Sequence, residues 1–248
     1  MDVENKIAVV TGSASGIGKA TALLLAEAGA RVVCADIDEA GGRELEKQAA
    51  ARGLDIRYLK IDLQDAASVA AFGAEFKKQF GRADILVNAA GWDRIQPFVE
   101  NSDEFIDKVV AINLGGPVRL AKALLPGMIE GGGGAIVNVA SDAGRVGSMG
   151  ETVYAAAKGG MIAFTKSLAR ETARYKVNVN CVCPGPTDTP LFHAQPEKLK
   201  DALTRAIPFR RIGDPKEVAE AIMFFAGARS SYVTGQVLSV SGGLTMVG

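Results

Sequence analysis

The sequence predicts an α/β protein whose single parallel sheet of seven strands is doubly wound, with helices on both faces. Strand-like and helix-like segments alternate along all 248 residues, which is the pattern of a parallel sheet covered on both sides. A glycine-rich turn joins the first expected strand directly to the first expected helix, and a second strand follows. Such a strand, turn, helix and strand form the first unit of a doubly wound sheet.

Each expected strand is a short apolar run, and helical periodicity fills the intervals between runs. The strands are expected at 6–11, 31–36, 56–61, 85–88, 135–140, 177–182 and 237–240. The helices are expected at 17–28, 40–52, 66–80, 102–129, 152–174 and 215–226. Four glycines at 131–134 lie between a helix and a strand, which indicates a tight connection rather than a domain boundary. We therefore expect one domain over residues 1–248, with a substrate lid at about 188–212.

Composition excludes several classes of function. The formal net charge is zero, and the absence of a lysine or arginine run argues against nucleic-acid binding. The first residues lack a signal-peptide pattern, and no apolar run approaches the ~18 residues of a membrane span. The three cysteines, Cys34, Cys181 and Cys183, are expected in buried packing in a reducing, cytoplasmic setting. A C-x-C pair with a single histidine is a poor metal site, so no metal is expected.

The glycines of the first turn each have a physical purpose. Gly12 permits a tight turn, Gly16 lets the backbone approach a pyrophosphate, and Gly18 allows the helix to pack closely on the strand. The helix that follows adds free N–H groups and a partial positive charge at its N-terminus. With a strand on either side, this G-x-x-x-G-x-G turn predicts a dinucleotide cofactor.

Asp36, at the end of the second expected strand, predicts which dinucleotide is bound. A carboxylate there can accept hydrogen bonds from the adenosine ribose diol. It would repel the extra phosphate of NADP by about 4 kcal/mol at ~4 Å and an effective dielectric of ~20. No lysine or arginine stands at 13–15 or directly after Asp36 to neutralise that phosphate. The sequence therefore predicts NAD.

Tyr154 and Lys158 are the strongest candidates for chemistry. On a helix, residues at i and i+4 share one face about one turn apart. An ammonium ~5 Å from a phenol favours the phenolate by about 3 kcal/mol, or roughly two pKa units. Lys158 is therefore expected to lower the pKa of Tyr154 toward the working pH, so that the phenol can act as an acid and base. Ser141, thirteen residues upstream, would hold the reacting oxygen.

The carboxyl ends of the expected strands carry Thr11-Gly12, Asp36, Asp62, Asn88–Gly91, Ser141 and Pro184-Gly185, and the motifs of the chain occur in the order of a known family. The chain resembles the short-chain dehydrogenase/reductases, which have a Rossmann-type fold, over essentially its whole length. The segments that carry the resemblance are Thr11–Gly18, Asp62-Leu63, Asn88–Gly91, Asn113, Ser141, Tyr154–Lys158 and Pro184-Gly185. One departure is Ala89, where the family often has a second asparagine.

The resemblance implies a role for each matching residue. Tyr154 would be the catalytic acid and base, Lys158 would also hold the nicotinamide ribose, Ser141 would orient the substrate oxygen, and Asn113 would hold a proton-relaying water. The implied cofactor contacts are Gly12, Ser15, Gly16, Ile17, Gly18, Asp36, Ile37, Asp62, Leu63, Asn88, Ala89, Ala90, Gly91, Tyr154, Lys158, Pro184, Gly185, Thr187 and Thr189.

Several segments, including Gly91–Asp93 and the stretch from Ala140 to Tyr154, resemble the 2-hydroxycyclohexanecarboxyl-CoA dehydrogenases within that family. This implies oxidation of a β-hydroxyacyl-CoA to a β-ketoacyl-CoA with NAD. A 3-oxoacyl-thioester reductase, another secondary alcohol dehydrogenase and a catalytically silent NAD-binding regulator are the alternatives. The family is usually tetrameric, so a homotetramer is expected.

Each residue that can contact the substrate also has a structural alternative. Trp92 and Met149 can line an apolar pocket or pack elsewhere. Arg145 can meet a thioester carbonyl or a CoA phosphate, or form a surface ion pair. His193 lies in the expected lid. Arg210 and Arg211 can attract CoA phosphates or form a solvated pair.

Overall fold

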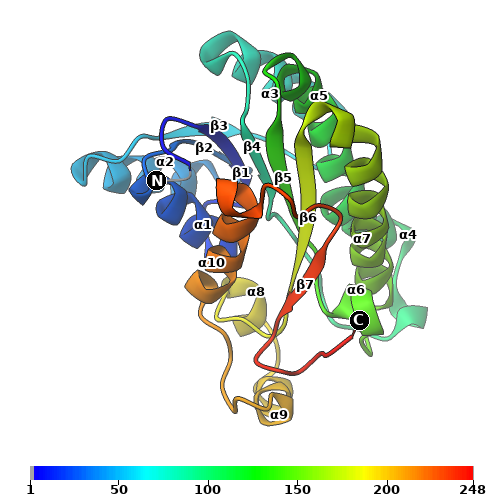
Figure 1. The fold of residues 1–248 in the computed structure, drawn as a ribbon. Helices are drawn as coiled ribbons and strands as arrows, with labels where there is room; N and C mark the ends of the chain where they lie inside the picture. The colour runs from blue at the N-terminus through cyan, green and yellow to red at the C-terminus, as the bar shows by residue number, and fades with distance from the viewer. Residues whose placement is uncertain (1–2, 248) are drawn as a thin grey trace.

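The computed structural model describes residues 3–247 and confirms the parallel sheet of seven strands with helices around it (Figure 1). The strand order is β3-β2-β1-β4-β5-β6-β7, and every neighbouring pair is parallel. The strands are β1 Ile7–Thr11, β2 Arg31–Asp36, β3 Ile56–Lys60, β4 Ile85–Asn88, β5 Gly134–Val139, β6 Val177–Pro184 and β7 Val237–Val240.

The helices cover both faces of the sheet. The α-helices are α1 Gly16–Glu27, α2 Glu39–Ala51, α3 Ala66–Phe80, α4 Asp103–Val110, α5 Gly116–Glu130, α6 Ala143–Val146, α7 Thr152–Thr172, α8 Pro190–His193, α9 Glu197–Ala206 and α10 Pro215–Ala226. Short 3-10 turns occupy η1 Phe98–Glu100, η3 Ala173–Tyr175 and η4 Ala228–Ser230, and η2 Ala111–Gly115 is a π turn.

Alternate strand residues enter two separate hydrophobic layers. Val10 belongs to the layer under α1, α2 and α10, whereas its neighbour Val9 belongs to the layer under α3, α5 and α7. Successive side chains of a strand point to opposite faces, so a strand that is buried on both faces must be apolar at every position. This requirement explains why the strands read as continuous apolar runs rather than as alternating patterns.

The strand order reverses between β1 and β4, and this reversal creates the crevice. β1 pairs with β2 on one side and with β4 on the other, so the chain winds outward in both directions from this point. Thr11 ties the two strands together at their ends, because its Oγ1 accepts hydrogen bonds from Ala89 N at 3.0 Å and Ala90 N at 3.1 Å. In open α/β sheets, ligands bind beyond the carboxyl ends of the strands at such a switch point.

The helix expected over 102–129 is interrupted. It consists of α4, the π turn η2 and α5, which together run from Asp103 to Glu130. Asn113 lies in the π turn, and its Nδ2 donates to the carbonyl of Val109 four residues earlier at 2.9 Å. Because a π turn holds one extra residue and often marks a functional site, the interruption directs Asn113 inward, where it is fully buried.

Among residues 3–247, the run Asp103–Glu130 is the one helical stretch long and apolar enough to cross a membrane by length and composition. Only 39% of its most apolar window is buried inside the chain. Core helices of soluble proteins pass the same test, so this finding alone is weak evidence for a membrane span.

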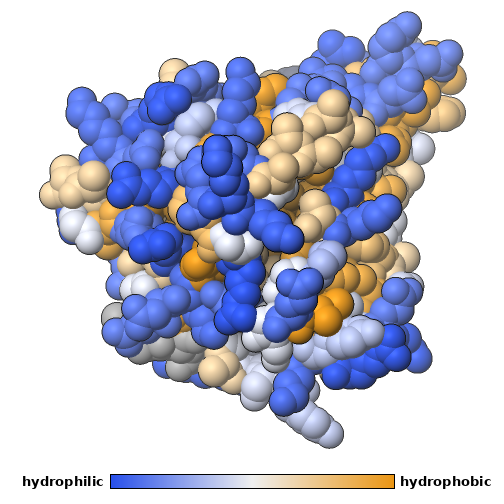
Figure 2. Space-filling view, turned by 90° about the horizontal axis from the view of Figure 1, so that it is seen from above, coloured by the Kyte–Doolittle hydropathy of each residue, from blue (hydrophilic) through white to orange (hydrophobic). Residues whose placement is uncertain are grey.

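Seen from above, the end of the molecule away from α9 is mostly hydrophilic, with hydrophobic side chains gathered in bands (Figure 2).

The segment expected as a lid, 188–212, contains two helices that the sequence pattern did not predict, α8 and α9. Both begin next to a proline: Pro190 opens α8 and Pro196 caps α9. Proline is favoured in the first turn of a helix because its fixed φ suits that position and its missing N–H is not needed there. α9 buries none of its residues fully and projects from the body of the molecule (Figure 1).

Candidate active site

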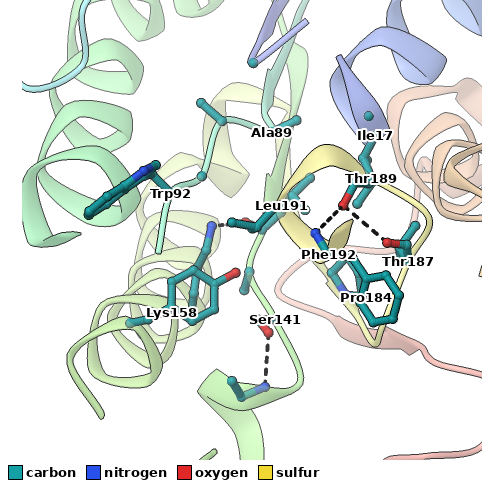
Figure 3. A pocket seen from close by; sticks show the side chains of 18 of the residues that line it. Ile17, Ala89, Trp92, Ser141, Lys158, Pro184, Thr187, Thr189, Leu191 and Phe192 are labelled. Carbon is teal, nitrogen blue, oxygen red and sulfur yellow. Dashed lines mark hydrogen bonds between the residues drawn. The ribbon is translucent and has the colours of Figure 1, made fainter. Parts of the chain in front are cut away.

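A cavity of about 740 Å³ lies at the carboxyl ends of β1, β4, β5 and β6. Its wall contains most of the residues singled out from the sequence, several of which are drawn in Figure 3. The predicted residues that line it are Gly12, Ser15, Gly16, Ile17, Gly18, Asp36, Ile37, Asp62, Leu63, Ala89, Ala90, Gly91, Trp92, Ser141, Tyr154, Lys158, Pro184, Gly185, Thr187 and Thr189.

The glycine turn has the close contacts that its sequence predicts. Gly12 has a φ of +66°, and a Cβ on it would lie 2.7 Å from the Cα of Ala90. A Cβ on Gly18 would lie 2.2 Å from the carbonyl oxygen of Gly12. Backbone atoms cannot move aside as a flexible side chain can, so both positions require glycine. The turn therefore brings the N-terminus of α1 against the cavity, where its N–H groups suit a pyrophosphate.

Asp36 stands at the end of β2 with its carboxylate fixed in place. Oδ2 accepts from the N–H of Ala14 at 2.9 Å, and Oδ1 accepts from the N–H of Asp38 at 3.0 Å. These two bonds link the carboxylate to the glycine turn on one side and to the start of α2 on the other. Asp36 lines the cavity, so a negative charge is held where the adenosine ribose of a dinucleotide would lie.

Tyr154, Lys158 and Ser141 meet on the other side of the cavity. Tyr154 and Lys158 occupy successive turns of α7, and the Lys158 Nζ lies 5.6 Å from the centre of the Tyr154 ring. Nζ also donates to the carbonyl of Val139 at 2.9 Å. Ser141, just beyond β5, accepts from the N–H of Ala143 at 3.1 Å (Figure 3). The geometry therefore brings together a phenol, an ammonium and a hydroxyl.

The electrostatics of this group differ from the sequence-based expectation. Burial raises the pKa of Tyr154 above its usual value, the nearby Glu151 carboxylate acts in the same direction, and the Ser141 hydroxyl opposes both. Burial also lowers the pKa of Lys158 to about 8. The pKa of Tyr154 therefore lies above its usual value and not near the working pH as expected, because desolvation of the phenol is the largest influence on it.

Asn113 does not line the cavity but braces its wall. Its Nδ2 donates to Trp92 O at 2.7 Å and its Oδ1 accepts from Trp92 N at 3.2 Å. A Cβ on Gly91 would lie 3.2 Å from Asn113 Oδ1 and 3.5 Å from Lys158 Nζ, so the amide stands close to the Lys158 ammonium. The structure shows that Asn113 fixes the loop after β4, and the implied water-holding role stays a prediction.

Asn88, which was expected among the cofactor contacts, does not line the cavity. It is buried behind the cavity wall, and its Nδ2 donates to Asn138 Oδ1 at 2.8 Å. Asn138 Nδ2 donates to Thr165 Oγ1 at 2.9 Å, and that hydroxyl donates to Met161 O at 2.8 Å. The chain of bonds joins β4, β5 and α7, so the Asn88 side chain positions the strand ends, and its expected cofactor contact stays a prediction.

Of the residues expected to contact the substrate, Trp92 lines the cavity. Its ring packs 5.6 Å from that of Phe105, and the Lys108 Nζ lies 3.9 Å from the ring centre. Met149 is 95% exposed and outside the wall, because the turn that precedes α7 directs it to solvent. His193 is also outside the wall and hydrogen-bonds Asp188 on the surface.

The arginines expected near CoA phosphates have other partners. Arg145 donates to Ser239 Oγ at 2.8 Å and to Val247 O at 2.7 Å. Arg211 forms a two-point pair with Glu217, with both distances 2.7 Å. Arg210 donates to the carbonyl of Arg205. Each guanidinium is therefore engaged with the chain itself.

Several wall residues were missed by the sequence reasoning. Glu151 lies three residues before Tyr154, which places both on one face of the chain entering α7, and that spacing could have revealed it. Burial raises the pKa of Glu151, and burial raises the pKa of nearby Asp93 to about 6. No such signal marks the lid and C-terminal residues of the wall, which are Leu191, Phe192, Gln195, Leu203, Leu244 and Thr245.

The cysteines form no disulfide within residues 3–247, and this part of the chain has no group of three or more ligating side chains suited to a metal. Cys181 and Cys183 lie on one side of β6 with their Sγ atoms 4.0 Å apart. Cys34 accepts from Ser13 Oγ at 2.8 Å, and burial raises the pKa of its thiol to about 11. All three thiols are buried, so they act as packing groups.

Comparison with known proteins agrees with this geometry. A family profile described as Enoyl-(Acyl carrier protein) reductase matches residues 12–245. The 3-oxoacyl-[acyl-carrier-protein] reductase FabG of Thermotoga maritima is 39% identical over 246 residues, which cover 99% of this chain and 100% of that protein. The chain belongs to the short-chain dehydrogenase/reductase family.

Two further proteins are similar over nearly the whole chain. The (2S)-[(R)-hydroxy(phenyl)methyl]succinyl-CoA dehydrogenase subunit BbsD of Thauera aromatica is 39% identical over 246 residues, or 99% of each chain. A solved structure described as gox2181 superposes with a TM-score of 0.93 at 34% identity and covers 97% of this chain and 96% of that one. The chain is thus an oxidoreductase of a family that acts on alcohol and keto groups with a nicotinamide cofactor.

Proposed function

We propose that this protein is an NAD-dependent dehydrogenase that oxidises a β-hydroxyacyl-CoA, of the 2-hydroxycyclohexanecarboxyl-CoA type, to the β-ketoacyl-CoA. The observation that carries the cofactor preference is the fixed carboxylate of Asp36 in the cavity wall. Two backbone N–H groups hold that charge at the end of β2, so it cannot turn away from an added phosphate. The cost of placing a phosphate beside it is about 4 kcal/mol at ~4 Å, nearly a thousandfold in affinity.

The residues of the cavity suit both the cofactor and the reaction. The Gly12 and Gly18 turn and the N-terminus of α1 would hold the pyrophosphate, and Asp36 would hold the ribose diol. A nicotinamide held there would supply the acceptor for the hydride of the carbinol carbon. Tyr154 receives the proton from the hydroxyl oxygen, Ser141 orients that oxygen, and Lys158 supplies positive charge beside the phenol. Proton and hydride leave together as the carbonyl forms, so no alkoxide charge accumulates.

The thioester class is supported by a relative and by the cavity wall. The Thauera aromatica relative is named as a dehydrogenase of a CoA ester that carries a phenyl ring and a hydroxyl. The wall near Tyr154 contains Trp92, Ile95, Val146 and Leu191, which suit an apolar acyl group. A cavity of about 740 Å³ lies in the range of ~300–1,000 Å³ that is usual for ligand sites.

A 3-oxoacyl-[acyl-carrier-protein] reductase is the second candidate, because relatives from Thermotoga maritima and Vibrio harveyi carry that name at 39% identity. The same residues would then run the reaction toward the alcohol. Asp36 favours the dehydrogenase, since biosynthetic reductions usually draw on NADPH, whose added phosphate this carboxylate would repel.

The experiment that tests the proposal combines cofactor binding with a substrate panel. Purified protein is titrated with NADH and NADPH, and NADH formation is followed with cyclic and straight-chain β-hydroxyacyl-CoA esters, free cyclic alcohols and sugars. We expect tighter NADH binding and the highest kcat/KM on a cyclic CoA ester. Inactivity on every CoA ester with good rates on free alcohols would remove the thioester class, and tighter NADPH binding would remove the NAD preference.

Two variants make the cofactor test sharper. Asp36→Asn keeps the shape of the side chain and removes its charge, so NADPH binding is expected to improve relative to NADH. Glu44→Gln removes a similar charge from an exposed position on α2 and serves as the matched control. Equal effects of the two variants on the NADH to NADPH ratio would show that net charge, and not the Asp36 carboxylate, sets the preference.

We also propose a homotetramer in the cytoplasm. Its support is the run Asp103–Glu130, which is apolar but only 39% buried inside one chain, together with three free, buried cysteines. Sedimentation equilibrium at assay concentrations tests the assembly, and a mass of one or two chains would reject it. Fractionation of cells that produce the protein tests the compartment.

A further inference from the structure

The C-terminal segment turns back from the sheet and reaches the cavity. After β7 ends at Val240, the chain passes through Gly242 and Gly243, with φ values of +60° and +88° that glycine adopts readily. Leu244 and Thr245, which follow, line the cavity. Figure 1 shows the segment after β7 bending away from the sheet and then returning toward α6. A segment close to the C-terminal end of the described residues thus forms part of the cavity wall.

Contacts with residues of the lid hold the start of the C-terminal segment. Phe209 N donates to Gly242 O at 3.2 Å, and a Cβ on Gly242 would lie 2.9 Å from Ile207 Cγ2. Further along, Leu244 N donates to Ser241 O at 3.2 Å and Thr245 N to Ser241 Oγ at 3.3 Å. These bonds fix the bend of the segment. Its last described residue, Val247, is held by a different contact.

That contact is made by Arg145 on α6. Its Nη1 donates to Ser239 Oγ at 2.8 Å and its Nη2 donates to Val247 O at 2.7 Å. One guanidinium therefore spans both ends of the C-terminal segment, from β7 to the last described residue. The Ser239 hydroxyl in turn donates to Asp142 Oδ1 at 2.5 Å, next to the catalytic Ser141. A planar guanidinium with several fixed donors suits such a two-point clamp, whereas an ammonium does not.

The short helix that carries Arg145 is itself tied to the catalytic residues. Gly144 N donates to Ser141 O at 3.0 Å, and Asp142 N donates to Pro184 O at 3.1 Å. A Cβ on Gly144 would lie 2.7 Å from the backbone C of Lys158, so α6 packs directly on α7. The position of Arg145 is thus set by Ser141 and Lys158, and through Arg145 the C-terminal segment is aligned with them.

We propose that residues 242–247 form a specificity-determining wall of the acyl pocket and that Arg145 is the positioning residue that holds this wall against the catalytic loop. The inference rests on the proposed function for its substrate class, β-hydroxyacyl thioesters. It replaces the expected contact of Arg145 with a CoA phosphate, since the guanidinium is engaged by Ser239 and Val247. When Arg145 no longer donates to Ser239 and Val247, Leu244 and Thr245 lose their fixed positions and the acyl group binds more weakly. The hydride and proton transfers at Tyr154 proceed as before.

Two thioesters of the same acyl group separate the clamp from a phosphate contact. One is the CoA ester and the other is the N-acetylcysteamine ester, which lacks the CoA phosphates. Arg145→Ala is expected to raise KM for both esters about tenfold, the effect of one lost hydrogen-bonded anchor, and to leave kcat and the Kd of NADH nearly unchanged. Arg145→Lys keeps the charge and one bond and is expected to restore KM in part. Arg174→Ala, on the exposed η3 turn, is the matched control.

A chain that ends at Thr245 lacks the carbonyl that Arg145 holds, and it supplies the coupling test. If Arg145 acts through the segment, Arg145→Ala has no further effect on KM in the shortened chain. Hydrogen exchange gives a second measurement: Arg145→Ala is expected to speed amide exchange at 244–247 and to leave β6 protected. Thermal melting of each variant checks folding.

Three results would overturn the proposal. Arg145→Ala could raise KM only for the CoA ester, which would show a phosphate contact. Its effect could add fully to that of the shortened chain, or the Kd of NADH could rise as much as KM. If the wild-type protein turned over no thioester but oxidised another secondary alcohol, the proposed function would fail, and the same variants assayed with that alcohol would still decide the role of Arg145.

Discussion

Replacing Lys158 with methionine is expected to lower turnover by about 150-fold below pH 8. Methionine has a similar length, so the change removes mainly the charge. The Lys158 Nζ lies 5.6 Å from the Tyr154 ring centre, and at an effective dielectric of ~20 a unit charge at that distance is worth about 3 kcal/mol. If the phenolate forms in the rate-limiting step, this energy corresponds to roughly two pKa units and about a 150-fold change in rate.

The pH dependence identifies the charge as the cause. Burial lowers the pKa of Lys158 to about 8, so the ammonium is present below that pH and lost above it. The ratio of wild-type to Lys158→Met turnover is therefore expected to be largest near pH 6–7 and to shrink above pH 8. The assay is NADH formation at saturating NAD and substrate from pH 6 to 10, with the Kd of NADH measured for each variant.

Lys158→Arg is the control, because a guanidinium keeps its charge throughout this range and its rate ratio to Lys158→Met is expected to stay constant. Turnover of Lys158→Met within fivefold of wild type, or a ratio to wild type that does not change with pH, would refute the reasoning. Either outcome would leave Lys158 as a binding or packing residue only.

The same variant tests the cost of burying the ammonium. The pKa of Lys158 falls from 10.5 to about 8 on folding, so below pH 8 the folded state carries the full cost of a desolvated charge. Between pH 8 and 10.5 the folded state has lost the proton and the unfolded state still holds it, so this cost is relieved as pH rises. The free energy of unfolding of wild type, relative to Lys158→Met, is expected to rise by up to about 3 kcal/mol from pH 7 to 10.5. Urea denaturation at both pH values measures it, and no change in the difference would contradict the assignment.

Three further variants test other parts of the site. Tyr154→Phe is expected to keep NADH binding and to lose about 10²–10⁴-fold in turnover; near-normal activity would rule the acid and base assignment out. Gly18→Ala is expected to abolish NADH binding or folding, since its Cβ would lie 2.2 Å from Gly12 O, whereas Gly159→Ala, whose nearest contact would be 3.3 Å, is expected to bind NADH normally. Thr165→Val leaves Asn138 Nδ2 without its 2.9 Å acceptor and is expected to lower the free energy of unfolding, measured in urea, by about 1–3 kcal/mol. An unchanged midpoint of urea unfolding would contradict a stabilising role for this hydrogen bond.

The strands and the residues at their carboxyl ends could be predicted from the sequence, because each depends on the order of residues within one short segment. The central strands β1 and β4 are buried on both faces and are apolar over nearly their whole length, and the run Val32-Val33-Cys34 of β2 is apolar for the same reason, so such runs indicate where a strand lies. The ligand-facing residues follow from the strands, because the carboxyl ends of parallel strands share one edge. Asp36 and Gly12 could be assigned to the cavity for this reason. Gly18 could be assigned because a close backbone contact admits no other residue.

The features that escaped prediction depend on contacts between distant segments. Leu244 and Thr245 enter the cavity because Arg145 and the lid hold the chain end, and nothing in their own neighbourhood encodes that path. Asn88, at the end of β4, and Asn113, in the π turn η2, belong to the same motif set as the cavity-lining residues, yet their partners are Asn138 and the backbone of Trp92 and Val109. A sequence motif predicts that an amide side chain lies near the site. Contacts with distant segments determine whether that side chain lines the cavity or is buried behind its wall.

The acidity of Tyr154 shows the same limit and explains why the site needs a lysine that is costly to bury. Spacing along α7 gives the attraction of Lys158 for the phenolate, but burial of the phenol and the carboxyl of Glu151 both raise the Tyr154 pKa, with Asp93 adding to them. Because burial raises the pKa of Asp93 to about 6, that carboxyl is ionised above pH 6 and then opposes phenolate formation further. Between about pH 6 and 8 the Lys158 ammonium, whose Nζ lies 5.6 Å from the Tyr154 ring centre, must therefore offset desolvation of the phenol and the charge of Asp93. Lys158 is the cation that lies beside this ring within residues 3–247, so its loss removes that attraction, and the positive charge of a bound, oxidised nicotinamide would be a further source of attraction that the reaction itself supplies.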